Sequence, residues 1–383
     1  MSEAPAPDTT PADCTGYFLY HSIGQYPGKA ADLAGATAEF AGVWGTCDDA
    51  QWGHLLGRRA AFIDRWRTLI GAREGSVTTC ENVTAGVYSI MGALPRERLR
   101  GRRVLVAGDC FPSLHFLLTG LAPRLGFTLD TVPLRAGADW VEDDDIIAQW
   151  GDDVGVALLT WVSSTSSHRS DIARLAAHGR EMGSLVGADI TQAAGLLPFD
   201  VAGTGVDFTV STSLKWMCGT PGAGIIHVDE ALIPQCHPEF RGWFSQDNPF
   251  SWDFDAFAFA PDIRRFDNGT PAALAAIASL PAMEWHAAQD HAAMRAHNRR
   301  LCARIIEGAE ALGHHLVSPR DPDLRGGSVM LRLPDSLPAG EVLGRLRGAG
   351  VFADARDNLL RFSPGAVTTD AGVDRLLEAL PSA

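Results

Sequence analysis

The residue in this sequence best suited to chemistry is a lysine. Lysine occurs only at Lys29 and Lys215, so nearly all of the positive charge is arginine. Lys215 follows the strand-like run DFTVSTS and precedes the turn GTPGAG, a place where a side chain can project from a sheet end into a crevice. An amine can form a Schiff base, which a guanidinium cannot, and the apolar neighbours Leu214 and Trp216 would lower its pKa. The pattern favours a nucleophile, with a surface loop lysine as the alternative.

An aspartate ends an earlier strand-like run. Asp189, in ADITQAAG, follows the apolar stretch SLVGAD, and a buried carboxylate there needs a cationic partner. The protonated nitrogen of a pyridine cofactor is such a partner, because a facing carboxylate keeps that ring an effective electron sink. The alternative is an aspartate that caps the following turn.

Three further segments are candidates for ligand contacts. The stretch CENVTAGVYSIM predicts a helix that begins at Asn82 or Thr84, and a helix N-terminus can bind phosphate or can simply be capped. Phe111 follows the strand-like run VLVAGD, where its ring could stack on a planar cofactor or pack in the core. Arg356 and Arg361 near the C-terminus could each bind a carboxylate in a bidentate manner or remain surface charges.

Several other chemistries have no motif in this sequence. The turn GTPGAG has the spacing G-x-x-G-x-G and precedes a strand, so it does not indicate a dinucleotide fold. HxxxH, HExxH, CxxC, GxSxG and Walker patterns are missing. We therefore predict no metal site.

The elements that must position these residues alternate between strand and helix. Strand-like runs at 104–109, 156–162, 184–190, 207–213 and 223–228 are separated by amphipathic stretches. This alternation predicts an α/β fold with a mainly parallel sheet covered on both faces, between about residues 55 and 270. Beyond it, a helical stretch at 272–312 should kink or split at Pro281 and lead into a compact α+β unit.

The predicted organisation has four parts. Residues 1–15 are expected to be a disordered tail and 16–50 an N-terminal segment. A large domain at 51–270 would bind the cofactor, and a small C-terminal domain would occupy 271–383.

Composition limits the class of protein. The net charge of −14 argues against nucleic acid as a partner, and the apolar runs are too short to span a membrane. The first residues lack the basic and apolar regions of an export signal. Seven scattered cysteines predict no disulfide framework, so we expect a cytoplasmic protein.

In their order, these motifs resemble the class V branch of the fold-type I pyridoxal-phosphate enzymes, and within it kynureninase. The resemblance rests on YFLYHSIGQYP, NVTAGV, FPS, D-x-x-Q at Asp189, Lys215, and a C-terminal arginine, and it covers about residues 17 to 380. The segments that resemble kynureninase most are FPS, GWF, NGTP and RDNLLRFSP. The resemblance implies the fold-type I architecture, with a seven-stranded sheet in the large domain.

The resemblance also implies roles for individual residues. Lys215 would hold pyridoxal 5'-phosphate as a Schiff base and then carry the α-proton, while Asp189 would pair with the pyridine nitrogen. Arg361 would bind the substrate α-carboxylate. The remaining cofactor-binding residues would be Thr84, Ala85, Phe111, Ser113, Gln192 and Ser213.

A homodimer with shared active sites is implied as well. Trp243 and Asn268 or Thr270 would reach the phosphate of the neighbouring subunit, and Ser22 lies where the family places a substrate-binding residue from the second subunit. Three positions depart from the kynureninase pattern: Leu214 stands in place of a Tyr, Thr46 in place of a His, and Leu114 in place of an Asp.

The function implied is kynureninase-like hydrolytic Cβ–Cγ cleavage of an amino acid, or a related β-cleavage, through an α-carbanion. The alternatives are a class V aminotransferase, a C–S β-lyase, and a non-catalytic binding protein on the same fold. The identity of the substrate is left open.

Overall fold

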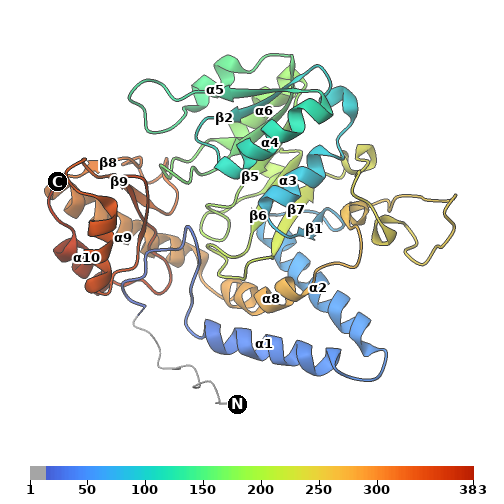
Figure 1. Ribbon diagram of the computed structural model, residues 1–383, viewed down its shortest axis with the longest axis horizontal. Coiled ribbons are helices and arrows are strands. Elements are labelled where there is room, and N and C mark those ends of the chain that lie inside the picture. Colours follow the sequence, from blue (N-terminus) through green and yellow to red (C-terminus); the bar gives the residue numbers. More distant parts are fainter. Residues whose placement is uncertain (1–13) are drawn as a thin grey trace.

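The computed structural model describes residues 14–383, and its largest unit is a seven-stranded sheet (Figure 1). In space the strands follow the order β1-β7-β6-β5-β4-β2-β3. Strands β2 to β6 run parallel, whereas β7 lies antiparallel to both β6 and β1. The predicted α/β fold with a mainly parallel sheet is therefore confirmed. The strands are β1 (Val77–Cys80), β2 (Arg103–Ala107), β3 (Thr128–Val132), β4 (Val154–Thr160), β5 (Leu185–Asp189), β6 (Phe208–Thr212) and β7 (Gly224–Val228).

Both faces of this sheet are covered by helices. Successive side chains of a strand point to opposite faces, so Val104 and Val106 of β2 pack in one core and Leu105 and Ala107 in the other. Helices α3 and α4 contribute to the first core, and α2, α6 and α8 to the second. These helices are α2 (Ala50–Leu69), α3 (Val83–Met91), α4 (Pro112–Leu125), α6 (Ile172–Met182) and α8 (Leu274–Ala287).

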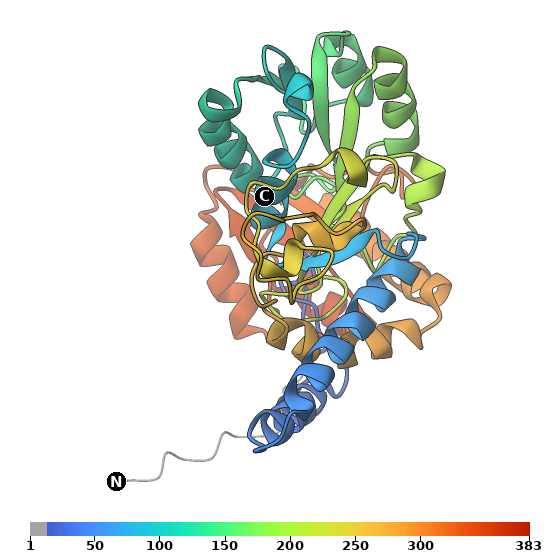
Figure 2. The ribbon, with the colours of Figure 1, turned by 90° about the vertical axis from the view of Figure 1, so that its right-hand side faces the viewer.

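The remaining helical segments lie at the ends and edges of the large unit. Helix α1 (Lys29–Trp44) packs against α8 and α2, and in Figures 1 and 2 it lies at the opposite end of the molecule from α6. The shorter segments are α5 (Asp143–Gln149), α7 (Val201–Thr204) and the 3-10 helices η1 (Arg96–Arg98), η2 (Ile233–Gln235), η3 (Trp243–Ser245) and η4 (Ile263–Phe266).

A second sheet forms near the C-terminus. It is antiparallel, in the order β10-β11-β9-β8, and it shares a core with three helices. Phe18 from the N-terminal segment is buried in this core, and Tyr17 and Leu19 bridge to Phe352 and Ser363. The elements are β8 (His315–Leu316), β9 (Val329–Arg332), β10 (Asp354–Arg356), β11 (Leu359–Phe362), α9 (His291–Ala311), α10 (Ala339–Gly348) and α11 (Asp370–Ala379).

The helical stretch at 272–312 breaks in a different place from the one predicted. Helix α8 continues through Pro281, and the break comes at residues 288–290, where the side chain of Asp290 caps α9. Leu280 and Met283 flank the proline and are buried, so their packing outweighs the one hydrogen bond that Pro281 cannot make. The predicted split at Pro281 is therefore wrong, whereas a kink there stays a prediction.

Other predicted boundaries stay as predictions. The expected tail at residues 1–15 lies outside the described residues except for Cys14 and Thr15. Helix α8 packs in the core of the large sheet. In the C-terminal part of the chain, the first buried residue in the core of the small sheet is Leu301 on α9. Among residues 14–383, no helix has the length and apolar character needed to cross a bilayer.

Candidate active site

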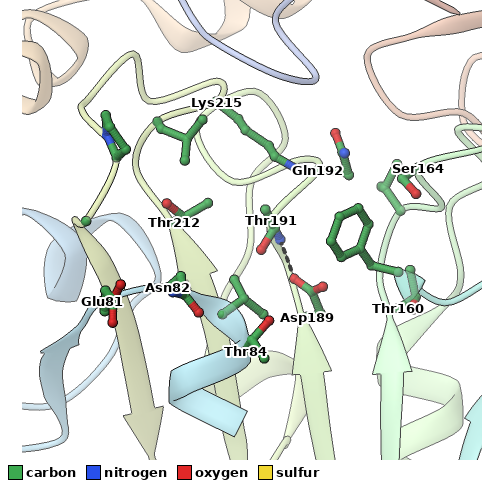
Figure 3. A pocket seen from close by; sticks show the side chains of 16 residues that line it. Glu81, Asn82, Thr84, Thr160, Ser164, Asp189, Thr191, Gln192, Thr212 and Lys215 are labelled. Atoms are coloured by element: carbon green, nitrogen blue, oxygen red, sulfur yellow. Dashed lines mark hydrogen bonds between the residues drawn. The ribbon is translucent and has the colours of Figure 1, made fainter. Parts of the chain in front are cut away.

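A pocket of about 360 Å³ lies at the carboxyl ends of the central strands (Figure 3). Thr160, Asp189 and Thr212 are the last residues of β4, β5 and β6, and all three line it. Parallel strands bring their carboxyl ends to one edge of the sheet, so the pocket collects side chains that are distant in sequence. The other lining residues are Glu81, Asn82, Val83, Thr84, Phe111, Val162, Ser164, Thr191, Gln192, Leu214, Lys215, Pro221 and Gly222.

Lys215 enters this pocket from the loop after β6 (Figure 3). Its Nζ lies 5.5 Å from the centre of the Phe111 ring. Burial lowers the pKa of Lys215 to about 8, although the nearby Asp189 carboxylate acts in the opposite direction. Near neutral pH the ammonium form still predominates, but far more of the amine is neutral than at the ordinary lysine pKa, which favours a nucleophile or a base.

Asp189 lies deeper in the same pocket and is 7% exposed. Its Oδ1 accepts a hydrogen bond of 3.0 Å from the backbone amide of Thr191, drawn as a dashed line in Figure 3. Burial raises the pKa of Asp189 in spite of this bond and of the charge on Lys215. The carboxylate would therefore gain from a cation placed against it.

The N-terminus of α3 forms another wall of the pocket. Asn82 is the cap of this helix, since its side-chain oxygen accepts from the Ala85 amide at 2.9 Å; Thr84 is not the cap. The Gly86 amide donates to the Asn82 carbonyl, so the first-turn amides of Val83 and Thr84 have no protein partner among the described residues. Free amides at a helix N-terminus, together with the helix dipole, suit a phosphate group.

Comparison with known proteins identifies the family. Residues 64–334 match the family model described as Aminotransferase class-V, and residues 294–380 match the Kynureninase C-terminal domain. The chain belongs to the class-V aminotransferase family. Its members use pyridoxal 5'-phosphate, so this chain is a pyridoxal-phosphate-dependent enzyme that acts on an amino acid as its small-molecule substrate.

Curated relatives of this class-V chain include several kynureninases. The kynureninase of Deinococcus radiodurans is 29% identical over 334 residues, which cover 82% of this chain and 78% of the relative. That of Salinispora tropica is 28% identical over 312 residues, covering 77% and 72% of the two chains. An uncharacterized aminotransferase of Bacillus subtilis is 25% identical over 316 residues, covering 82% and 80%.

Solved structures share the fold of this class-V chain. The cystine C–S lyase C-DES superposes with a TM-score of 0.85 at 18% identity and covers 95% of this chain and 96% of its own. A cysteine desulfurase from Thermococcus onnurineus NA1 has a TM-score of 0.84 at 17% identity, covering 94% and 92%. At these identities the likeness concerns the fold, and the expected fold-type I architecture is confirmed.

The pocket residues fit pyridoxal phosphate. Thr212 Oγ1 is buried and has no hydrogen-bond partner among the described residues. An unpaired buried hydroxyl is costly, and a phosphate oxygen near the α3 N-terminus would satisfy it. The cofactor has three further groups that match this pocket. Its aldehyde suits the amine of Lys215, its pyridine nitrogen suits the carboxylate of Asp189, and its planar ring suits the exposed ring of Phe111.

Of the other residues expected to bind the cofactor, some line the pocket and others do not. Gln192 lines the pocket, and its Nε2 lies 3.4 Å from the His21 carbonyl oxygen. Ser113, in the first turn of α4, is not among the lining residues. Ser213 is fully buried outside the lining, and its hydroxyl donates to the Ala223 carbonyl at 2.7 Å. Thr212, one residue earlier, presents the hydroxyl that was expected of Ser213.

The residues expected to serve a neighbouring subunit lie outside the pocket of their own chain. Asn268 and Thr270 line a separate pocket of about 290 Å³ together with Ala85, which is absent from the lining of the first pocket. Trp243 borders an open hollow beside the exposed loop that follows it. Ser22 is half-buried in a turn whose backbone amide donates to the Leu19 carbonyl.

Sequence reasoning missed several polar residues in the pocket. Thr160 and Thr212 end buried parallel strands, so their position gave the same signal as that of Asp189. Ser164 lies in an irregular loop after β4 and carries no such signal. Glu81 directly precedes the helix cap and was passed over in favour of Asn82.

Proposed function

We propose that the chain cleaves its amino acid substrate at Cβ, by hydrolysis of the Cβ–Cγ bond as in kynureninase. The observation that carries the proposal is the match of residues 294–380 to the Kynureninase C-terminal domain, because this segment contains Arg361. The kynureninase relatives, which extend over most of the chain, support the same reaction.

The pocket residues have definite tasks in this proposal. Pyridoxal phosphate supplies an aldehyde and an electron sink for negative charge at the substrate α-carbon. Lys215 would hold the cofactor through its amine, and with substrate bound its Nζ would be the group that accepts the α-proton. Its lowered pKa, about 8, suits an amine that both accepts and returns a proton near neutral pH. Asp189 would stabilise a protonated ring nitrogen.

Phosphate and ring are held by other elements. The amides of Val83 and Thr84 and the hydroxyl of Thr212 would hold the phosphate, and Phe111 would offer its face to the ring. Arg361 binds the α-carboxylate from the small sheet, beside the Ser164 carbonyl to which its Nη1 donates at 3.3 Å.

The same proposal includes a homodimer with shared sites. Phe250, Trp252 and Phe254 are 75%, 82% and 94% exposed in one surface loop, an apolar exposure typical of a protein interface. Trp243 and Asn268 are held against each other, since the Phe244 amide donates to the Asn268 carbonyl at 3.2 Å. A neighbouring subunit would receive them as one unit.

A class-V aminotransferase is the second candidate. It is favoured by the name of the family model and by the aminotransferase of Bacillus subtilis among the relatives. A sulfur-transferring reaction has less support, because none of the cysteines in residues 14–383 lines the pocket.

The test begins with the cofactor. Purified protein supplied with pyridoxal phosphate should be yellow, and borohydride reduction should attach the cofactor to Lys215, which mass spectrometry distinguishes from Lys29. Lys215→Ala should abolish both the adduct and turnover, whereas Lys29→Arg should retain them. A colourless protein that takes up no cofactor would mean a binding protein on this fold.

A second assay separates the reactions. Hydrolysis predicts an anthranilate-type product and alanine from L-kynurenine or 3-hydroxykynurenine. Release of a keto acid from an amino donor, with neither kynurenine consumed, would establish transamination instead. Release of sulfide from L-cysteine would establish a C–S lyase.

A further inference from the structure

A buried ion pair holds Arg361, the arginine proposed to bind the substrate α-carboxylate. Arg361 on β11 is 5% exposed, and two of its donors are bound by the carboxylate of Asp354 on β10. Nε lies 2.9 Å from Oδ1, and Nη2 lies 2.5 Å from Oδ2. One side of the guanidinium is therefore occupied by a carboxylate of the protein itself.

Asp354 is in turn held by a histidine from the N-terminal segment. His21 is 2% exposed, and its Nε2 lies 2.9 Å from Asp354 Oδ1. The other ring nitrogen, Nδ1, lies 2.7 Å from the hydroxyl of Ser363. Burial would raise the pKa of Asp354, but the bonds from His21 and Arg361 outweigh it and keep the pKa below its usual range. Asp354 is thus a carboxylate, and His21 donates to it through Nε2.

The remaining side of Arg361 lies next to the pocket, although Arg361 itself is not one of the lining residues. Asp354 occupies the edge formed by Nε and Nη2, which leaves the terminal edge of Nη1 and Nη2 for a second carboxylate. Nη1 also donates to the carbonyl of Ser164, a residue of the pocket lining. The positive charge of Arg361 contributes to the low pKa of Lys215, so the two side chains lie close enough to act on one substrate.

We propose that Asp354 and His21 are positioning residues that hold the terminal edge of Arg361 toward the α-carboxylate of the substrate. The inference rests on the proposed role of Arg361. Without Asp354, the long arginine side chain would keep the Ser164 carbonyl as its remaining partner and would be free to turn its other edge to the ligand. It would also lie near Lys215 without a neutralising charge.

His21 links this arrangement to the N-terminal segment. Its own carbonyl oxygen accepts from Gln192 in the pocket, and three residues later the Gly24 amide donates to the Leu214 carbonyl at 2.9 Å. A Cβ on Gly24 would lie 1.9 Å from the Lys215 carbonyl oxygen, so the segment packs tightly against the lysine loop. His21 therefore joins the carboxylate-binding arginine to the same segment that supports Lys215.

The test compares two ligands of the holoenzyme. L-Alanine carries the α-carboxylate, and ethylamine is the same molecule without it, so the ratio of their Kd values, measured by absorbance and calorimetry, reports the carboxylate contact. Asp354→Ala should raise the Kd of L-alanine about tenfold or more, the scale of a charged hydrogen-bonding contact, and change that of ethylamine by less than about threefold. Asp335→Ala, an exposed aspartate on the same small domain, is the matched control and should behave like the wild type.

Two histidine variants test the second positioning residue. His21→Gln retains a side-chain N–H that can reach Asp354, and it should keep most of the preference for L-alanine. His21→Leu removes the N–H donor and should therefore lose the preference for L-alanine. A merely structural role would weaken both ligands alike in both variants.

The outcomes separate this inference from the proposed role of Arg361. If Arg361→Ala does not change the L-alanine preference, the carboxylate role of Arg361 is wrong. If that variant loses the preference but Asp354→Ala and His21→Leu bind L-alanine as tightly as the wild type or more tightly, the positioning role is wrong. If Asp354→Ala does not bind the cofactor, the positioning role is tested with two other variants. These are His21→Leu and Asp354→Asn, which preserves the shape of the side chain and one acceptor oxygen.

Discussion

At the scale of single residues, the environment of Lys215 makes the sharpest prediction. Its pKa of about 8 is set mainly by burial, against an ordinary lysine value of 10.5. In the protein without cofactor, acetylation of Lys215 by trace acetic anhydride should therefore rise with pH to a half-maximum near pH 8, because the neutral amine reacts. Mass spectrometry can follow Lys215 and Lys29 separately.

A variant of the neighbouring Asp189 tests the direction of its effect on the pKa of Lys215. Asp189 favours the ammonium form and raises the pKa of Lys215, so Asp189→Asn should move the half-maximum to lower pH. A half-maximum near 10.5 in the wild-type protein would show that Lys215 is solvated and would remove the basis of its proposed role.

Phe111 supports a prediction on cofactor affinity. The side chain is 43% exposed and lines the pocket, so its face is available to a planar ring. Stacking of aromatic rings contributes about 0.5–1.5 kcal/mol beyond buried area, so Phe111→Leu should raise the Kd of pyridoxal phosphate by roughly 2- to 12-fold. Equilibrium dialysis measures this, and Phe111→Tyr, which keeps the ring, should bind as the wild type does. Equal affinity in the Leu variant would rule out stacking.

The residues that could be predicted share one property: their chemistry is unusual for their place in the sequence. Lys215 is one of two lysines, and Asp189 ends an apolar run, so both could be found without coordinates. His21 and Asp354 could not be found this way, since they are ordinary residue types whose meaning comes from a contact between positions 21 and 354. Ser213 was expected from the family resemblance, but the direction of the backbone decides which of two adjacent hydroxyls faces the pocket, and it is that of Thr212.

At the scale of elements, α3 is positioned by a glycine. A Cβ on Gly86 would lie 2.8 Å from Ile226 Cγ2 on β7 and 3.1 Å from Cys80 Sγ on β1. Gly86→Ala should therefore destabilise the protein without cofactor by about 1–3 kcal/mol, the usual cost of overpacking, partly offset by the better helix propensity of Ala.

Gly53 on α2 is the matched control for this prediction. A Cβ there meets no atom within 4 Å, so Gly53→Ala should stabilise the protein by about 0.5–1 kcal/mol through helix propensity alone. Denaturant unfolding of both variants measures the two changes. Equal and small effects would show that α3 is free to shift away from the sheet.

The predicted elements were those with strong periodicity. Strands β2, β4 and β5 are apolar except for one terminal residue each, and β6 (FTVST) alternates apolar and polar residues over its first four positions. Helix α4 places Leu114, Leu118 and Leu121 on one face. Strands β1 (VTTC) and β3 (TLDTV) were not predicted, because their polar residues give a weak strand pattern; their pairing with β7 and β2 defines them. Tertiary contact likewise decided the course of α8 through Pro281.

At the scale of the whole molecule, the exposed aromatic loop raises the question of assembly. The segment between η3 and η4, which contains Trp252 and Phe254, forms the yellow loop at the right of Figure 1, on the opposite side from the small sheet. The sequence indicated a shared site through GWF and NGTP, but periodicity cannot show which surface a second subunit would cover. The exposed aromatic side chains of this loop indicate that it is the surface a second subunit would cover.

The double variant Trp252→Asp and Phe254→Asp therefore tests the proposed homodimer. Two charges in the aromatic loop should prevent its burial and yield a monomer in sedimentation equilibrium, while the wild-type protein has twice the mass. Leu324→Asp, which changes an exposed apolar residue outside the aromatic loop, is the control and should remain a dimer. Because Trp243, Asn268 and Thr270 would no longer reach a neighbouring phosphate, the monomer should also bind pyridoxal phosphate more weakly. A wild-type monomer, or a double variant that stays dimeric with unchanged affinity, would contradict the shared site and leave these three residues without a role in cofactor binding.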